Sequence, residues 1–177
     1  IRPIKGVCGY FEENGTAAEL QEAYYYMGSV YRDLNDYPNA VTYFLKSTEV
    51  AESNSDIDSA LWECTYSQLS YLYNQQFNYS SALDAAIKGL DIAEKFNTSN
   101  ERTYINTSTA YFESGDTTNA TTLCNKAINN ILGNGISKNN ADIVSKAMYH
   151  YTITNQYLHA GLCYELLKSL PKNELPR

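Results

Sequence analysis

Two histidines and four cysteines are the side chains of this 177-residue chain that are best suited to hold a metal ion. His159 and Cys163 are four residues apart, so a single helix would present both on one face. Zinc sites usually have three or four protein ligands, and the spacing of the other residues supplies no third one. His150 comes directly before a tyrosine that we expect to pack in the core, which places it on a helix flank. The sequence therefore predicts no metal site and no cofactor.

The cysteine spacing and the absence of catalytic motifs argue against an enzyme. The four cysteines are Cys8, Cys64, Cys124 and Cys163. Gaps of about 40 to 60 residues without a CxxC pair favour lone buried thiols over disulfides or a zinc knuckle. The chain has no glycine-rich phosphate loop, no nucleophile elbow and no paired-carboxylate motif. We therefore expect a protein that is not an enzyme.

The charge balance restricts the class of partner. The chain has 13 Lys and Arg against 20 Asp and Glu, a net charge of −7, and residues 1–90 hold five basic and twelve acidic side chains. Such a chain is repelled by polyphosphate, so we expect no nucleic-acid partner through this segment. No apolar run approaches the roughly 20 residues of a membrane-spanning helix, which predicts no membrane insertion.

The first residue, Ile1, follows no initiating Met and opens no secretory leader. We expect the chain to be an excised or processed piece of a longer protein. A cytoplasmic and a periplasmic location both stay open.

An internal repeat organises the chain. Tyrosine is followed nine residues later by alanine at four places: Tyr31 and Ala40, Tyr73 and Ala82, Tyr111 and Ala120, Tyr151 and Ala160. Successive alanines are about 40 residues apart. With only nine Gly and four Pro in the whole chain, this period favours helices.

Each repeat reads as a helical hairpin. Large side chains recur at i, i+3 and i+7, with a small residue such as Gly28 or Ser108 at i+4. Turn-forming residues follow the closing tyrosine, and a second helix begins after them. A narrow point on one helix and an alanine on the next allow the two helices to cross closely.

This spacing resembles the tetratricopeptide repeat. The first unit carries it most completely, with Tyr24, Met27, Gly28, Tyr31, Ala40 and Phe44. The period exceeds the family's roughly 34 residues, which adds one or two helical turns to each hairpin. The resemblance implies an all-α, right-handed superhelical solenoid. The triple tyrosine and the segment Tyr31-Arg32-Asp33-Leu34 more narrowly resemble the tetratricopeptide segment of bacterial signalling and regulator proteins.

The repeat pattern predicts the domain organisation. Residues 1–15 are the second helix of a truncated leading repeat, and residues 16–170 contain four repeats. The repeats span about 21–62, 63–100, 101–140 and 141–170. Residues 171–177 are a tail.

The resemblance also implies that the first helices line a concave groove that binds protein segments. The candidate groove residues are Tyr25, Tyr26, Ser29, Arg32, Gln68, Tyr71, Asn74, Arg102, Asn106, Thr109 and Tyr149. The same register gives Ile105 and Phe112. Side-chain amides can donate to and accept from a peptide backbone at once, and tyrosines offer rigid area with a polar tip. The two lysines with which some family members grip a C-terminal carboxylate are missing.

Most of the 17 tyrosines are explained by packing. Eleven occupy repeat positions, namely Tyr24, Tyr31, Tyr37, Tyr66, Tyr73, Tyr79, Tyr104, Tyr111, Tyr151, Tyr157 and Tyr164. We expect these to be structural, because aromatic residues at helical spacing are usually core. Tyr25, Tyr26, Tyr71 and Tyr149 are left as candidate ligand contacts.

Two functions follow from this pattern. The first is a protein- or peptide-binding module, the sensory or interaction segment of a larger bacterial regulatory protein. The alternative is a structural scaffold that self-associates end to end and has no groove ligand. An enzyme would need a set of essential catalytic residues, and the sequence shows none. A metal or cofactor bound tightly to the purified protein would reopen that possibility.

Overall fold

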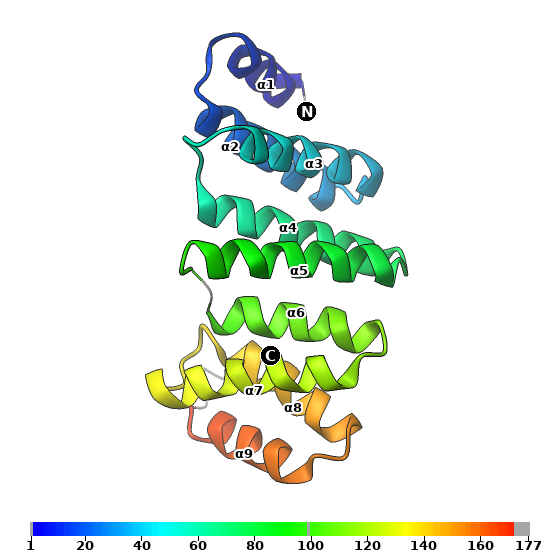
Figure 1. Ribbon diagram of the computed structural model, residues 1–177, viewed down its shortest axis with the longest axis vertical. Helices are drawn as coiled ribbons and strands as arrows, with labels where there is room; N and C mark the ends of the chain where they lie inside the picture. Colours follow the sequence, from blue (N-terminus) through cyan, green and yellow to red (C-terminus); the bar gives the residue numbers. More distant parts are fainter. Residues whose placement is uncertain (1, 99, 172–177) are drawn as a thin grey trace. The chain divides into compact units, whose positions relative to one another are not determined.

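The computed structural model describes residues 2–98 and 100–171, with side chains from Gly6 onward (Figure 1). The chain folds as two compact units, residues 1–98 and 99–177. The first contains α1 (Arg2–Asn14), α2 (Ala17–Asp33), α3 (Tyr37–Ser53), α4 (Ser59–Gln75) and α5 (Tyr79–Lys95). The second contains α6 (Glu101–Glu113), α7 (Thr117–Asn134), α8 (Ala141–Ile153) and α9 (Tyr157–Lys168). Apart from Pro171, the tail predicted at 171–177 lies outside the described residues.

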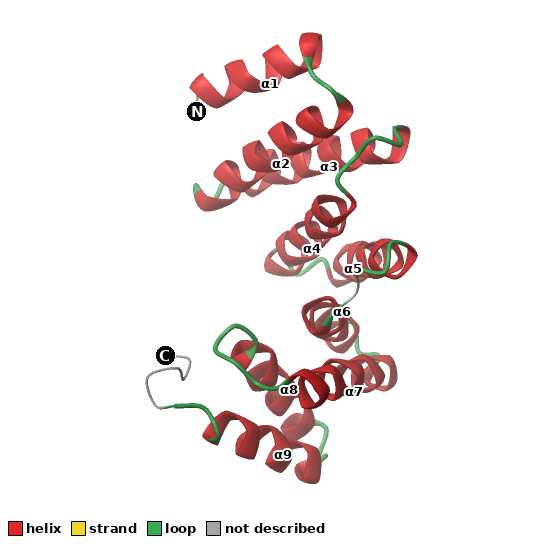
Figure 2. Cartoon of the chain, turned by 90° about the vertical axis from the view of Figure 1, so that its left-hand side faces the viewer, coloured by secondary structure: helices red, strands yellow, loops and turns green. Residues whose placement is uncertain are grey.

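The elements in both described ranges are all helical, which confirms the predicted all-α fold of hairpins. In the first unit α2 packs on α3 and α4 on α5, while α1 packs on α2 and α3 on α4. Figure 2 shows α2 and α4 on one side of this unit and α3 and α5 on the other. In the second unit α6 pairs with α7 and α8 with α9, and α6 also contacts α8.

Side-chain caps fix where the helices begin. Thr16 and Glu19 form a capping box: the Glu19 N–H donates to Thr16 Oγ1 at 3.3 Å, and the Thr16 N–H donates to Glu19 Oε2 at 2.9 Å. The second helix of each of three successive hairpins is capped by a single side chain, from Asp36, Asn78 and Asp116. Each side chain accepts the backbone N–H three residues later, which satisfies one of the unpaired donors of the first turn.

The turn inside each hairpin places one residue in the left-handed region of φ. These four residues are Asn35, Phe77, Gly115 and Asn155, with φ of 58°, 58°, 92° and 59°. Glycine and asparagine adopt this conformation readily, whereas a bulky side chain does so at a cost. Phe77 is therefore an outlier among four equivalent turns, and its side chain is 78% exposed.

The predicted close crossings of the two helices are confirmed. A Cβ added to Gly28 would lie 2.7 Å from Cδ1 of Phe44, whose side chain is fully buried. In the third repeat Ser108 Oγ donates to the carbonyl oxygen of Ala120 at 2.7 Å. Ala40, Ala82, Ala120 and Ala160, the four repeat alanines, are all buried. The helices can approach because these positions hold little or no side chain.

Tyrosines contribute to the cores, but not all in the predicted way. Tyr24, Tyr31, Tyr66 and Tyr151 are buried. The prediction is wrong for two others, because Tyr157 is 64% exposed and Tyr164 is 56% exposed. Both lie on α9, which packs against α8 alone among the described helices. Repeat packing positions on α9 are therefore left at the surface.

A lysine–tyrosine pair recurs in three hairpins, and the sequence pattern had not singled it out. The ammonium nitrogens lie 5.1 Å, 5.5 Å and 5.3 Å from the ring centroids in the pairs Lys46 with Tyr24, Lys88 with Tyr66, and Lys126 with Tyr104. Each pair is 22 residues apart in the sequence. In the fourth repeat the equivalent positions are Val144 and Leu166, so both partners are replaced together. A cation over an aromatic face is favourable by about 0.5–1 kcal/mol at exposed sites.

Candidate binding surface

Two exposed tyrosines dominate the side of the first unit that α2 and α4 form. Tyr26 is 55% exposed and Tyr71 is 50% exposed. Between α2 and the core, the half-buried Tyr25 ring lies 5.6 Å from the Phe44 ring and 5.6 Å from Tyr26, which it meets edge-on. Tyr25 is thus anchored by the core and in turn supports Tyr26. Tyr25, a predicted groove residue, therefore packs within the chain more than it is available to contact a ligand.

Arg32 of α2 joins the first helices of two neighbouring repeats. Its Nη1 donates to Gln68 Oε1 on α4 at 2.6 Å. Its Nε and Nη2 donate to Asp33 Oδ1 at 3.0 and 2.8 Å, and the Arg32 side chain is 26% exposed. The structure therefore brings Arg32 and Gln68 together and uses both in contacts within the chain.

We call this side of the first unit the α2/α4 surface. It comprises Tyr25, Tyr26, Ser29, Arg32, Gln68, Tyr71 and Asn74, all of which the sequence had proposed. Ser29 and Asn74 are half-buried. Rigid aromatic area beside amides and a hydroxyl suits contact with another polypeptide.

Cys64 is exposed at the same surface, so the expectation that all cysteines are buried is wrong for this one. Its Sγ donates to Glu63 Oε2 at 3.8 Å. Displacement of water from around the sulfur, together with the Glu63 carboxylate, raises the pKa of the Cys64 thiol to about 11. The thiol stays protonated at neutral pH and is a poor nucleophile. Cys8, Cys124 and Cys163 are buried as predicted.

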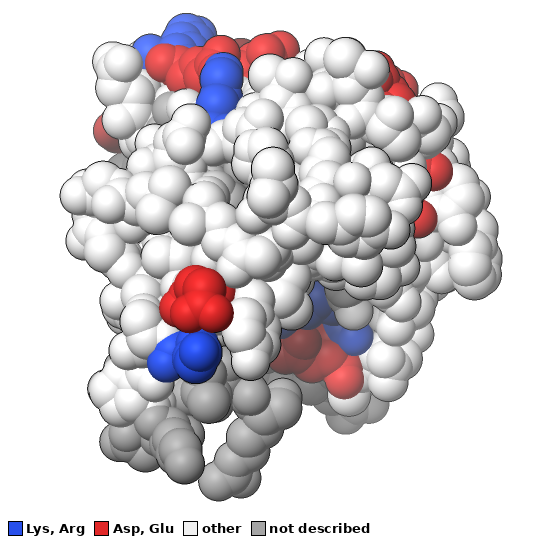
Figure 3. All heavy atoms as spheres, turned by 90° about the horizontal axis from the view of Figure 1, so that it is seen from below, with Lys and Arg blue, Asp and Glu red and all other residues white. Residues whose placement is uncertain are grey.

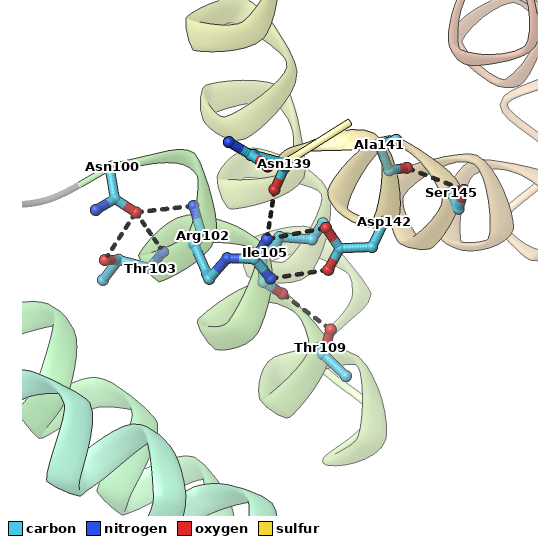
Figure 4. A network of polar contacts seen from close by, with 9 residues as sticks. All are labelled: Asn100, Arg102, Thr103, Ile105, Thr109, Asn139, Ala141, Asp142 and Ser145. Atoms are coloured by element: carbon cyan, nitrogen blue, oxygen red, sulfur yellow. Dashed lines mark hydrogen bonds and ion pairs between the residues drawn. The ribbon is translucent and has the colours of Figure 1, made fainter. Parts of the chain in front are cut away.

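In the second unit an ion pair links α6 to α8 (Figure 4). Arg102 Nη1 donates to Asp142 Oδ2 at 2.8 Å, and Nη2 donates to Asp142 Oδ1 at 2.9 Å. Nη2 also donates to the Asn139 carbonyl oxygen at 3.0 Å, just before α8. The guanidinium lowers the pKa of the Asp142 carboxyl. Both side chains are 46% exposed, so the pair is in contact with solvent.

The name α6/α8 surface is used for the corresponding side of the second unit, with Arg102, Asn106, Thr109, Asp142 and Tyr149. Tyr149 is 61% exposed and Asn106 is half-buried. Thr109 Oγ1 donates to the carbonyl oxygen of Ile105 within its own helix at 2.9 Å. The predicted groove position of Ile105 is wrong: it is fully buried in a cluster with Ile143 of α8, because α6 and α8 pack together there.

His150, which the sequence placed on a helix flank, is buried. Its ring stacks on Phe112 with centroids 4.9 Å apart, and Nδ1 lies 3.3 Å from Ser108 Oγ. Because Ser108 Oγ gives its proton to Ala120, we assign the proton of the 3.3 Å contact to His150 Nδ1. Burial lowers the pKa of His150, and the positive charge of Lys146 lowers it further. The Tyr–Ala repeat gave no signal for this contact, since Ser108 and His150 are 42 residues apart.

The possible metal ligands do not converge. The His159 ring is exposed and stacks on Tyr151 at 5.0 Å, whereas Cys163 is fully buried. Over residues 2–98 and 100–171, no three His, Cys, Asp or Glu side chains are grouped so that they could hold a metal ion. None of the helices described is long and apolar enough to cross a membrane.

Consecutive helical hairpins that cross at small residues define a helical-repeat protein. Residues 19–95 match the tetratricopeptide repeat family model. Residues 19–95 therefore contain tetratricopeptide repeats, and the hairpins beyond residue 95 share the same all-α architecture. A search of curated protein sequences finds no match.

Solved structures with the same fold span almost the whole chain. BtubC (BKLC) from P. vanneervenii is 14% identical with a TM-score of 0.79, covering 99% of this chain and 73% of that one. The apo form of RapI is also 14% identical with a TM-score of 0.79, covering 97% of this chain and 50% of RapI. MamA from Desulfovibrio magneticus is 14% identical with a TM-score of 0.65, and 97% of each chain is covered. At these identities the likeness concerns the fold alone.

Proposed function

We propose that this chain is a recognition module that binds a segment of a partner protein on the surfaces of its first helices. The observation that carries this proposal is the exposure of Tyr26 and Tyr71 on adjacent first helices. Neither ring is needed to fill the core, and exposed tyrosines beside amides are typical of protein contacts. Because the chain is acidic, the expected partner is a protein and not a nucleic acid.

The bound segment is an extended strand or a helix held by side-chain amides and rings. Asn74 and Asn106 can each donate to and accept from the backbone of such a segment. Tyr26 and Tyr149 would cover its apolar side chains while their hydroxyls stay in water. No catalytic step forms part of this proposal.

A regulatory role is the narrower part of the proposal, as the sensory or interaction segment of a larger bacterial regulatory protein. Two contacts between neighbouring repeats lie on the candidate surfaces: Arg32 with Gln68, and Arg102 with Asp142. A ligand that competes for these side chains would change how adjacent hairpins pack. Such a change would then pass to an output region elsewhere in the protein.

The test is binding of peptides selected from a random display library against the whole chain. Fluorescence anisotropy then measures their affinity for the variants Tyr26→Ala and Tyr71→Ala. We expect each to weaken binding by about tenfold or more, the loss of a central aromatic contact. Tyr157→Ala and Tyr164→Ala are matched controls, since these tyrosines are equally exposed but lie on α9. Equal losses of affinity in all four variants, or no loss in any of them, would contradict binding at the first helices.

A second candidate function, self-association, is favoured by the outer side of α9. Leu158 is 91% exposed and Leu162 is 40% exposed, in addition to the two exposed tyrosines of this helix. Figure 3 shows that uncharged side chains cover most of the face of the molecule that is seen from below. Exposed apolar patches of this kind often mark contacts between proteins.

Sedimentation velocity across a concentration series separates the two functions. Self-association predicts a sedimentation coefficient that rises with concentration and that Leu158→Glu returns to the monomer value. A monomer at every concentration excludes this second candidate and leaves peptide binding as the function.

A further inference from the structure

Negative charge is concentrated in the first unit. Residues 1–98 contain 14 acidic and six basic side chains, a net charge of −8, whereas residues 99–177 contain six acidic and seven basic ones. A partner segment that carries positive charge is therefore attracted to the first unit and gains little from the second.

The α2/α4 surface shares this imbalance. Arg32 is the sole Lys or Arg on α2 and α4, and Asp33 and Gln68 already occupy its guanidinium. Two carboxylates lie on the same helices: the exposed Glu22, one turn before Tyr26 on α2, and the half-buried Glu63, two turns before Tyr71 on α4. The carboxylates therefore lie on the same helix faces as the exposed tyrosines.

The negative charge at this surface affects the neighbouring Cys64 thiol. The carboxylate of Glu63 accepts from Ser67 Oγ at 3.4 Å as well as from Cys64. After burial, the charges of Glu63 and Asp58 are causes of the raised pKa of the Cys64 thiol. The negative charges of Glu63 and Asp58, which oppose the formation of a thiolate, favour the approach of a cation.

Tyrosine rings in this chain already hold ammonium groups. Lys46 lies 5.1 Å from the Tyr24 ring, and Lys88 lies 5.5 Å from the Tyr66 ring. The cations over those two rings are lysines of the same chain. Tyr26 and Tyr71 expose about half of their area to solvent, so their rings are open to a cation from a partner.

We propose that the α2/α4 surface binds a basic segment of the partner protein, one rich in Lys or Arg. Glu22 and Glu63 pair with its cations, and the Tyr26 and Tyr71 rings pack on the aliphatic stems and charged ends of the same side chains. The α6/α8 surface lacks this preference, since Arg102 and Asp142 balance each other and Lys146 is exposed beside them. This inference rests on the proposed function and names the chemistry of its partner.

The experiment compares three fluorescent peptides of equal length that share their neutral residues and carry Lys, Gln or Glu at alternate positions. Anisotropy with the whole chain should show the Lys peptide binding about tenfold more tightly than the Gln peptide, and the Glu peptide binding least. Raising the salt concentration should weaken the Lys peptide most, because exposed charges are screened.

A pair of double variants assigns the site. Glu22→Gln with Glu63→Gln removes two charges from the α2/α4 surface, and we expect about a fivefold loss of affinity for the Lys peptide. Glu49→Gln with Asp84→Asn removes two exposed charges from α3 and α5 of the same unit and should cost less than about twofold. Circular dichroism verifies that both double variants are folded.

Equal binding of the Lys and Gln peptides overturns the inference, and so do equal losses in the two double variants, which would indicate only long-range attraction. Failure of the proposed function looks different. Peptides selected from the random library could need Tyr26 and Tyr71 for binding but show no enrichment of Lys or Arg. That result would support the proposed recognition surface and contradict its preference for basic segments. If neither the library-selected peptides nor the designed Lys, Gln and Glu peptides depend on these tyrosines, both the proposed function and its preference for basic segments are contradicted.

Discussion

Gly28 is the residue at which packing leaves least freedom. Gly28→Ala would place a Cβ 2.7 Å from the fully buried Phe44 ring, which has no space into which to move. We expect the free energy of unfolding in urea to fall by about 1–3 kcal/mol, as for other overpacked sites. Gly161→Ala in α9 is the control: its Cβ would meet nothing within 4 Å, and the variant should gain about 0.5–1 kcal/mol. The same sign in both variants would contradict this account.

Phe77 carries backbone strain that its three counterparts avoid. Phe77→Asn should raise the free energy of unfolding by about 1 kcal/mol, because asparagine accepts the positive φ of 58° more readily. Phe77→Ala is the matched variant, since it removes the exposed ring but keeps a Cβ in the same conformation. Thermal unfolding should show a clear gain for asparagine over alanine. Equal midpoints would mean that the turn is not strained.

His150 should make stability depend on pH. Its native pKa is lowered, so the unfolded chain binds more protons than the folded one between that pKa and the ordinary value of 6.5. The stabilising contribution is complete above about pH 6.5 and is lost as the pH falls toward the native pKa. Urea unfolding between pH 8 and pH 5 measures this slope, which should flatten in His150→Gln. An unchanged slope in His150→Gln would exclude the residue as the cause.

The helices themselves could be predicted because the same local sequence features recur in successive hairpins. A tyrosine closes the first helix, an asparagine or glycine with positive φ turns the chain, and a side-chain cap opens the second. Two of the four turns have both features, at Asn35 with Asp36 and at Gly115 with Asp116. In the other two, Phe77 takes the turn position or Gln156 provides no side-chain cap. The spacing of Tyr and Ala therefore determined which segments pair, without any knowledge of distant contacts.

Contacts between repeats could not be predicted in the same way. The register placed Arg32, Gln68 and Arg102 on the first helices but gave no reason for Arg32 to meet Gln68, which lies 36 residues away. It also failed for Ile105, because α8 covers that side of α6. Lys46 and Tyr24 were recognisable in hindsight from the recurring 22-residue interval. Helical periodicity gives the side on which a residue lies, whereas its partner depends on how neighbouring helices are offset.

The ion pair between α6 and α8 should contribute modestly to stability. Because both side chains are 46% exposed, we expect a coupling energy between Arg102 and Asp142 of about 0.5–1 kcal/mol at low salt. A double-mutant cycle with Arg102→Gln and Asp142→Asn, followed by urea unfolding, measures it. The coupling should shrink in high salt. A coupling near zero at low salt would mean that the two helices are held by their apolar contacts alone.

At the scale of the whole chain, two compact units each combine an apolar core with a surface of first helices. The first core gathers around Met27, Phe44 and Leu69, and the second around Ile105, Val144 and Tyr151. Most of the candidate residues that sequence reasoning had proposed lie on these surfaces, but several of them hold neighbouring helices together. A ligand that binds there must either use the exposed tyrosines or compete with contacts between repeats.

The most direct measurement is the amide NMR spectrum of the ¹⁵N-labelled chain titrated with a library-selected peptide. We expect the largest shift changes in α2 and α4, around Tyr26, Ser29 and Tyr71, with smaller changes in α3 and α5. Changes confined to α3 and α5, or to α9, would contradict the central claim that the first helices form the recognition surface.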